Sequence, residues 1–269
     1  MRKYIKTAVL TVIAIISAAC QRDFDLKYHE IEPLTVIEAE LTPDGIRAGI
    51  TRTTPMDEPM NRSLLTDAIV TLTDITDGVQ YYLMADADGY FTDPTPGIEG
   101  HVYRLSVERN GEIFQAETTM YPPTEIIDIR FNWINMPYDQ VAVLQGQFLD
   151  NPSVNGDCYW IKLYRNGEIY MWKELDDRSA VNGIGTFFTI TTRRDTTEED
   201  DDTVLFDGDI ITMTIERISR SMHDYLEALQ NDSNGPALFS GPRCLGYFSA
   251  TSPSSASITF HPDDIPVFQ

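Results

Sequence analysis

The sequence predicts a mainly β protein built from two antiparallel, immunoglobulin-like β-sandwich domains, with one short helix in the second domain. Three observations predict this fold. Apolar residues recur at every second position in many short segments, turn residues separate these segments at regular intervals, and one segment has helical spacing. Because alternation buries one face of a strand, a series of such strands indicates stacked antiparallel sheets. We expect residues 33–121 to form the first sandwich and residues 124–269 the second.

The first predicted sandwich contains strands joined by tight turns. Residues 37–41 alternate, residues 43–45 (Pro-Asp-Gly) supply a turn, and the pair Asn110-Gly111 between alternating segments is a strong hairpin signal. The other expected strands cover residues 46–50, 68–73, 81–84 and 103–107. The pair Pro122-Pro123 lacks two backbone donors, so we place the domain boundary there.

The second predicted sandwich adds one helix to the same pattern. Its expected strands cover residues 129–133, 142–148, 159–163, 187–192 and 210–218. The pair Asn166-Gly167 marks a second hairpin. Apolar residues from Met222 to Leu229 recur at helical spacing and predict a helix near residues 220–231, with Ser221 in its cap. A single apolar stripe on so short a helix favours packing against a sheet over binding a partner.

The first twenty residues have the features of a lipoprotein signal peptide. A basic start is followed by an apolar run at residues 8–16, which is shorter than the about 20 residues that span a bilayer. The small residues Ser17-Ala18-Ala19 then precede Cys20, and this ending resembles a bacterial lipobox. It departs from the lipobox at Ser17, where a large aliphatic residue is usual. An ordinary secretory signal followed by a chance cysteine is the alternative.

This reading divides the amino-terminal region into two parts. We expect residues 1–19 to be cleaved as a signal peptide and residues 20–32 to form a polar tether. Cys20 is the expected lipidation site, carrying diacylglycerol and an acyl chain such as palmitate. Two or more chains make membrane anchoring stable, so the protein would sit on a membrane without crossing it. We expect no cofactor beyond this covalent lipid.

The acidic composition excludes two classes of partner. The chain has 20 Lys and Arg against 42 Asp and Glu, a net charge of −22. Removing residues 1–19 removes three basic residues, leaving 17 against 42 and a net charge of −25. Such a surface repels nucleic acid and anionic lipid headgroups, so we expect no nucleic-acid partner and no electrostatic membrane binding. It could attract cationic ligands or divalent metals.

Two cysteines remain once Cys20 is lipidated. In an envelope compartment, Cys158 and Cys244 are compatible with a disulfide or with two free thiols, and the sequence leaves both open.

No residue pattern indicates catalysis or a metal centre. The four histidines are scattered, and no serine lies in a G-x-S-x-G elbow. Residues 86–89 (Asp-Ala-Asp-Gly) have the spacing that begins a calcium loop, but Gly97 stands where an EF-hand needs Glu, so a β-turn is expected. The acidic run at residues 198–202 is expected to be a solvated loop. We therefore predict no catalytic residues, no metal site and no enzyme activity; weak calcium binding is not predicted.

Aromatic residues are the better candidates for binding. Trp160, Tyr164, Tyr170 and Trp172 crowd the second hairpin, together with Tyr159. Alternation places Trp160 and Tyr164 on one face of the strand and Tyr159 on the other. One face should be core, and the other could be an exposed platform for a glycan, a peptide or a protein. The alternative is that these residues serve ordinary cross-strand pairing.

Short motifs in a fixed order run along almost the whole mature chain. They cover residues 67–73, 88–90, 100–105, 121–123, 210–229 and 245–250. Their order resembles a Bacteroidota lipoprotein family, the domain of unknown function numbered 4249. The resemblance implies a surface lipoprotein with an immunoglobulin-like amino-terminal part, often encoded near TonB-dependent outer-membrane receptors, and no catalytic residue. In the same phylum, acidic residues such as Asp23 and Asp25 resemble the signal that sorts lipoproteins to the cell surface; an acidic tether without sorting meaning is the alternative.

Two functional hypotheses follow. The first is an outer-membrane, surface-exposed lipoprotein that acts as a non-enzymatic binding or accessory component of a TonB-dependent receptor uptake system. The alternative is a structural subunit of the fimbrial or adhesin type, matured by cleavage after an arginine so that a donated strand can fill the groove. Arg47 and Arg52 are the candidate cleavage sites. A hydrolase with unrecognised carboxylates is the least favoured alternative.

Overall fold

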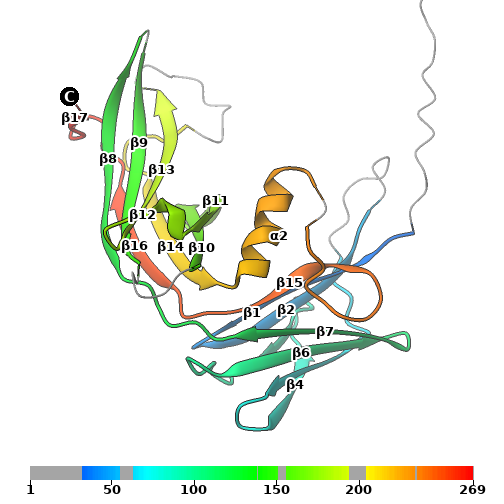
Figure 1. The fold of residues 1–269 in the computed structure, drawn as a ribbon. Helices are drawn as coiled ribbons and strands as arrows, with labels where there is room; N and C mark the ends of the chain where they lie inside the picture. The colour runs from blue at the N-terminus through cyan, green and yellow to red at the C-terminus, as the bar shows by residue number, and fades with distance from the viewer. Residues whose placement is uncertain are drawn as a thin grey trace, which may run out of the picture. The chain divides into compact units, whose positions relative to one another are not determined.

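The computed structural model describes residues 32–54, 63–137, 139–150, 156–193, 204–233 and 235–268. The predicted signal peptide, Cys20, nearly all of the tether and the acidic run at 198–202 lie outside these residues. The described part is mainly β, and its one α-helix is α2 (Arg220–Gln230), as Figure 1 shows. The predicted fold class, mainly β with one short helix, is confirmed at this level.

The first sheet has eight strands in the order β15-β1-β2-β5-β4-β3-β6-β7. Their bounds are β1 (Thr35–Thr42), β2 (Gly45–Arg52), β3 (Ile69–Asp74), β4 (Val79–Ala85), β5 (Phe91–Asp93), β6 (Val102–Arg109), β7 (Glu112–Thr119) and β15 (Cys244–Ala250). The inward positions of β1 and β2, such as Ile37, Ala39 and Ile50, are fully buried in the first core. Alternation therefore predicted the buried face correctly. Asn110 and Gly111 both have positive φ angles, as the predicted two-residue hairpin turn requires.

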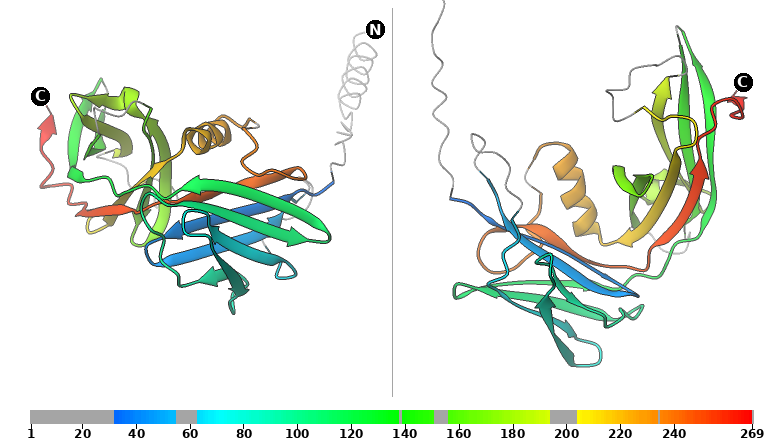
Figure 2. Two further views of the ribbon diagram at one scale, coloured as in Figure 1. Left: turned by 60° about the horizontal axis from the view of Figure 1, so that its bottom comes forward. Right: turned by 180° about the vertical axis from the view of Figure 1, so that it is seen from behind.

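The first sheet differs from the expected antiparallel sandwich in two ways. Its edge strand β15 pairs parallel with β1, although β15 follows the predicted boundary by about 120 residues. The two edge strands of the sheet, β7 and β15, also lie close to each other, as Figure 2 illustrates. Two isolated β-bridges connect the segments at these edges, one between Gln115 and Ser240 and one between Tyr121 and Thr251. The sheet thus nearly closes on itself instead of forming a sandwich from residues 33–121 alone. The physical reason is that the backbone N–H and C=O groups at the open edge of β1 need partners, and the distant strand β15 supplies them.

Two smaller sheets share the second core. One has the order β11-β10-β14-β16 and the other the order β12-β13-β9-β8-β17. Their bounds are β8 (Ile126–Met136), β9 (Asp139–Leu149), β10 (Cys158–Arg165), β11 (Glu168–Asp176), β12 (Ala180–Val181), β13 (Ile184–Arg193), β14 (Ile210–Ile218), β16 (Ser254–Thr259) and β17 (Val267–Phe268). Residues from both sheets, including Trp133, Phe148, Ile161 and Met213, are buried in one cluster. A short 3₁₀ turn (Asp177–Ser179) joins β11 to β12.

Helix α2 packs on β10 and β11, as its single apolar stripe predicted. Its N-cap is Ser219, whose Oγ accepts a hydrogen bond from the Met222 amide at 3.2 Å. The expected cap residue Ser221 is the second residue of the helix, and its hydroxyl contacts that of Ser219. Met222 and Leu226 are buried with Trp160 in a third cluster, while Leu229 remains exposed.

We expect Gly246→Ala to destabilise the pairing of β15 with β1. Gly246 has a φ of +105°, and an added Cβ would collide with the carbonyl oxygen of Ile37 on β1. The φ strain costs about 1–3 kcal/mol and the steric overlap a similar amount. Gly100→Ala is the matched control, since its φ is +84° with open space around the new Cβ. Urea unfolding monitored by circular dichroism should show a clearly larger loss for Gly246→Ala; equal losses would contradict the predicted collision.

Candidate functional site

The structure buries the aromatic residue on which the predicted platform depends. Trp160 is only 7% exposed and makes edge-to-face contacts with Trp172 and Tyr247, at centroid distances of 6.2 and 5.5 Å. Tyr164 and Trp172 are half-buried, and Tyr170 packs against the second core instead. The prediction of an exposed platform is therefore wrong for Trp160. Alternation separates the two faces of a strand but does not say what covers each face, and here α2 and β15 cover the Trp160 face.

A buried charged cluster lies beside Trp160. The Lys162 Nζ is 2.9 Å from Glu40 Oε1 and 2.8 Å from Glu216 Oε1, and it lies 3.8 Å from the centroid of the Trp160 ring. The Tyr247 hydroxyl donates a hydrogen bond to the same Glu40 oxygen at 3.1 Å. We call these residues the lysine cluster. It joins β1 and β15 of the first sheet to β10 and β14 of the second core.

Burial and neighbouring charges shift the pKa values of three groups in the lysine cluster. Burial favours the neutral amine, but the carboxylates of Glu216 and Glu40 prevail and raise the pKa of Lys162, which keeps its charge. Burial raises the pKa of Glu216 in spite of its lysine partner. Burial also raises the pKa of Tyr247, aided by the nearby glutamates. Lys162, Glu40, Glu216 and Tyr247 contact one another inside the protein, so their arrangement fits a structural junction between the two cores.

The two cysteines are free thiols in the structure, so the disulfide alternative is not the state observed. Cys158 is fully buried beneath α2, whereas Cys244 packs against the core of the first sheet. Burial raises the pKa of both thiols to about 11. Both groups are therefore protonated at neutral pH and are poor nucleophiles.

Two groups of side chains bring three possible metal ligands within 4.8 Å of one another. In the first, Asp74 Oδ2 lies 2.8 Å from His101 Nδ1, while Asp74 Oδ1 accepts the amide hydrogens of Thr76 and Asp77 in the turn after β3. The second group lies on α2, where His223 Nδ1 is 3.2 Å from Asp224. The Asp74 carboxylate therefore stabilises the turn after β3 and pairs with His101. No further observation on the described residues distinguishes either group as a metal centre.

The calcium-like segment at residues 86–89 forms a turn, in agreement with the preferred interpretation. Asp86 Oδ1 accepts the amide hydrogens of Asp88 and Tyr90, and Gly89 has a φ of +93°. The carboxylate of Asp86 is thus used to shape the backbone.

The candidate cleavage sites Arg47 and Arg52 both lie in β2, which pairs with β1 along its full length. The Arg47 guanidinium also stacks on the Tyr90 ring at 3.3 Å from the centroid. A protease would have to open a paired strand to reach either bond.

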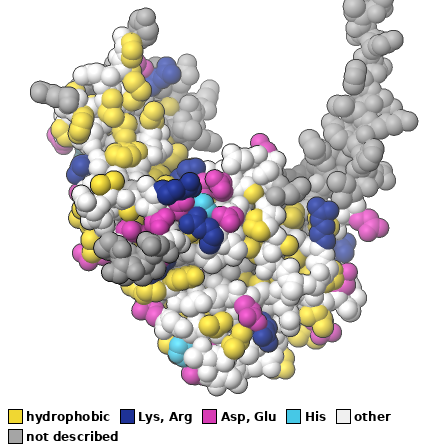
Figure 3. Space-filling model, in the orientation of Figure 1, with side chains coloured by type: hydrophobic (Ala, Val, Ile, Leu, Met, Phe, Trp, Pro, Cys, Tyr) yellow, Lys and Arg dark blue, Asp and Glu magenta, His cyan; other side chains and the backbone are white. Residues whose placement is uncertain are grey.

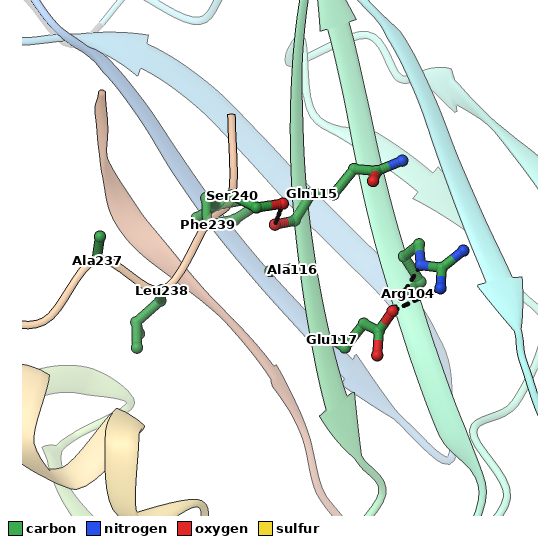
Figure 4. A pocket seen from close by; sticks show the side chains of 8 residues that line it. All are labelled: Arg104, Gln115, Ala116, Glu117, Ala237, Leu238, Phe239 and Ser240. Atoms are coloured by element: carbon green, nitrogen blue, oxygen red, sulfur yellow. Dashed lines mark hydrogen bonds and ion pairs between the residues drawn. The ribbon is translucent and has the colours of Figure 1, made fainter. Parts of the chain in front are cut away.

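A shallow groove of about 620 Å³ lies beside β7 (Figure 4). Ser240 and Gln115 exchange backbone hydrogen bonds of 2.7 and 3.1 Å along it, and Arg104 pairs with Glu117 at 2.6 Å. These polar groups already have partners, so the described residues along the groove offer no unpaired charge to a ligand.

A second cavity, of about 640 Å³, adjoins the diproline linker between β7 and β8. It is lined by Asp150, Asp157, Tyr159 and Arg217 as well as by the two prolines. The Asp157 carboxylate pairs with Arg217, and the Tyr159 hydroxyl donates to Asp150 Oδ1 at 2.5 Å. The sequence gives no signal for this site, because its residues come from the ends of separate strands and form no motif.

The outer face of β13 carries an exposed apolar patch. It consists of Val181, Ile184, Phe188 and Ile190, of which Phe188 is 62% exposed. Val181 pairs with Ile184 across the β12–β13 turn, while the intervening Phe187 points into the second core. Figure 3 shows hydrophobic side chains gathered over the sheet that contains β8, β9 and β13. Contiguous apolar patches of this kind commonly mark interaction surfaces.

Among the described residues, no helix is long and apolar enough to span a bilayer, and α2 has only 11 residues.

Comparison with known proteins gives one family match. A family model described as "Domain of unknown function (DUF4249)" matches residues 21–256. No curated protein matches the sequence. The crystal structure of the chicken CNTN1 FN1-FN3 domains is similar at 9% identity and a TM-score of 0.21, covering 81% of this chain and 68% of that chain. A similarity this distant supports no inference about the fold or function of this chain.

Proposed function

This chain belongs to the DUF4249 family, and from that premise we propose that it is a surface-exposed outer-membrane lipoprotein that assists a TonB-dependent receptor. In this role it binds a ligand or the receptor and catalyses no reaction. The observation that carries the proposal is the position of the match, which begins directly after Cys20, the residue expected to bear the lipid. The family resemblance to Bacteroidota lipoproteins then supplies the location and the class of partner.

The apolar patch of β13 supports a binding role. The patch exposes four large apolar side chains to water. Complete burial of such a side chain against a partner contributes about 1.5–3 kcal/mol, so binding that covers the patch would be favourable. A receptor domain or plug with a complementary apolar surface would cover them. The immunoglobulin-like character of the sheets is part of the same proposal, because loops on such scaffolds commonly carry binding surfaces.

We expect the protein to copurify with a TonB-dependent receptor from outer membranes, and the patch to be required. Phe188→Ser combined with Ile190→Ser should reduce receptor recovery by about tenfold or more, because it removes the apolar contact surface. Tyr82→Ser combined with Met84→Ser is the matched control, since these side chains are equally exposed on β4 of the first sheet. Mass spectrometry of the copurified chains provides the readout. Recovery of the protein alone across several detergents would contradict the proposal.

A further inference from the structure

Strand β13 has an open backbone edge beyond its first two residues. On one side it pairs with β9 from Ile184 to Arg193. On the other side, among the residues that the structure describes, it pairs with β12 only through Ile184 and Gly185. Figure 1 shows β13 next to β9, on the side of the sheet away from β8. The stretch from Thr186 onward is therefore an edge that β12 leaves uncovered.

The register identifies the backbone groups that face this edge. The Asp150 amide donates to the Gly183 carbonyl at 3.0 Å, so these two residues form a hydrogen-bonded pair in line with the β9–β13 ladder. Such pairs alternate along antiparallel strands, so the odd-numbered residues of β13, up to position 189, bond to β9. The N–H and C=O groups of Thr186, Phe188 and Ile190 then point away from β9, toward the open edge.

The side chains beside this edge are apolar on the outer face of the sheet. Phe188 and Ile190 are 62% and 58% exposed, and Leu149, which is 46% exposed, lies opposite Ile184 on β9. A chain that pairs with the edge would therefore also meet the apolar patch described above. Backbone groups and apolar side chains point to one binding surface.

Strand β13 lacks the usual protection of an edge strand. Proteins commonly place charged residues or proline on such strands, because an open edge can pair with another extended chain. No charged residue and no proline occurs from Ile184 to Thr192. The edge strand β11 of the other sheet, by contrast, includes Glu168, Lys173 and Glu174. The edge of β13 is thus suited to accept a strand.

We propose that an extended segment of the receptor adds to this edge as a further strand. Its backbone would exchange hydrogen bonds with Thr186, Phe188 and Ile190, and its alternate side chains would cover the apolar patch. An extended chain fits because its own N–H and C=O groups face one side at every second residue. This inference rests on the proposed function and specifies how the receptor would bind.

Charge restricts the composition of the segment. The mature chain is expected to carry 17 Lys and Arg against 42 Asp and Glu, a net charge of −25. A second copy of the chain would carry the same charge, so repulsion opposes the pairing of two β13 edges. The segment that fits best has apolar residues at alternate positions, no charge where it meets Phe188 and Ile190, and basic residues at its ends.

Thr186→Pro tests the backbone pairing and leaves the apolar patch in place. Proline removes an N–H that faces the open edge, and edge strands tolerate proline at such positions. Receptor recovery should fall by about tenfold or more, since a hydrogen bond of the interface is lost and its partner is left unpaired. Thr186→Val is the matched control, because it keeps the N–H and the side-chain shape, and it should retain wild-type recovery. Circular dichroism should be unchanged for both variants.

The outcomes separate strand addition from the proposed function. Receptor recovery that requires Phe188 and Ile190 but is unaffected by a folded Thr186→Pro variant would overturn strand addition and leave the binding role intact. A receptor that is never recovered with the wild type would contradict the proposed function, and with it the receptor as the source of the strand. The ability of the edge to accept a strand is then decided by a peptide.

A peptide probe tests the edge without the receptor and without relying on a variant that folds. Fluorescein-labelled Lys-Val-Thr-Val-Thr-Val-Lys-amide is titrated into the purified full-length protein in detergent, and fluorescence anisotropy measures binding. It should bind saturably, whereas the same peptide methylated on its three valine nitrogens should bind about tenfold more weakly or worse. The two peptides have the same charge and side chains, so the comparison isolates the backbone donors.

Two results with the peptides would overturn the proposal. The first is the absence of saturable binding, or equal binding of the methylated and unmethylated peptides. The second is binding that neither Thr186→Pro nor the combined Phe188→Ser and Ile190→Ser variant weakens, because the peptide would then occupy a different edge.

Discussion

Replacing Lys162 by methionine should lower the free energy of unfolding by about 3–5 kcal/mol, the cost of removing one partner from a buried ion pair. The substitution keeps most of the side-chain volume but leaves Glu216 buried without its cation. Glu40, at the other side of the amine, would also lose its ion pair, although it is more exposed. The effect should be fully present at neutral pH. The raised pKa of Lys162 means that its stabilising contribution declines only at alkaline pH, as the pH rises through that value.

Lys173→Met provides the matched control on the neighbouring strand. Lys173 contacts Glu174 at 3.0 Å, and its own side chain is 46% exposed although Glu174 is buried. Its replacement should therefore cost less than that of Lys162, whose side chain is 7% exposed and contacts two glutamates. Urea unfolding followed by tryptophan fluorescence would measure both variants, with the m-value as a check that the unfolded state is unchanged. A loss below about 1 kcal/mol for Lys162→Met would contradict the importance of the lysine cluster.

A compensating variant separates the cost of an orphaned charge from the cost of lost packing. Lys162→Met combined with Glu216→Gln removes both charges of the fully buried pair. Because apolar or neutral replacements of a buried ion pair are often close to neutral in stability, much of the loss should be recovered. If the double variant is no more stable than Lys162→Met, the destabilisation arises from packing around Trp160 and not from electrostatics.

The features that local chemistry determines were predictable from the sequence. Ile37 and Ala39 are buried as their alternation indicates, and Asn166 and Gly167 both adopt the positive φ angles of the predicted hairpin. The helix was also found, since its apolar stripe has only one compatible period. In each case, residues within a few positions of one another decide the outcome.

The features that depend on distant segments were not predictable. Nothing near Cys244 indicates that its strand will pair with Thr35, because that pairing completes an edge formed two hundred residues earlier. From its sequence position, Lys162 is expected to face solvent on a half-buried strand. It is buried because Glu40, on a strand of another sheet, pairs with it in the folded protein. The same limitation explains Trp160, whose face is closed by α2 and Tyr247. Asp157 and Arg217 likewise meet only after folding, so the cavity that they line has no motif in the sequence.

Cys20→Ser should transfer the protein from the membrane fraction to the soluble fraction almost completely. The lipid chains supply about 0.8 kcal/mol for each methylene buried in the bilayer, and a chain with a net charge of −25 after cleavage has no electrostatic attraction to replace them. Circular dichroism of the released protein should match the wild type, because no described strand or helix contains residue 20. Fractionation with immunoblotting measures the distribution.

Cys244→Ser is the matched control for this prediction, since it removes a half-buried thiol and leaves the proposed anchor intact. It should remain in the membrane fraction. Determination of the mature amino terminus completes the test, because lipidation requires the chain to begin at a modified Cys20. A chain that begins just after Arg47 or Arg52 would instead favour the fimbrial alternative and would require β2 to be cut within its pairing with β1. If Cys20→Ser still sediments with membranes, the proposed anchor is wrong and another contact must hold the protein there.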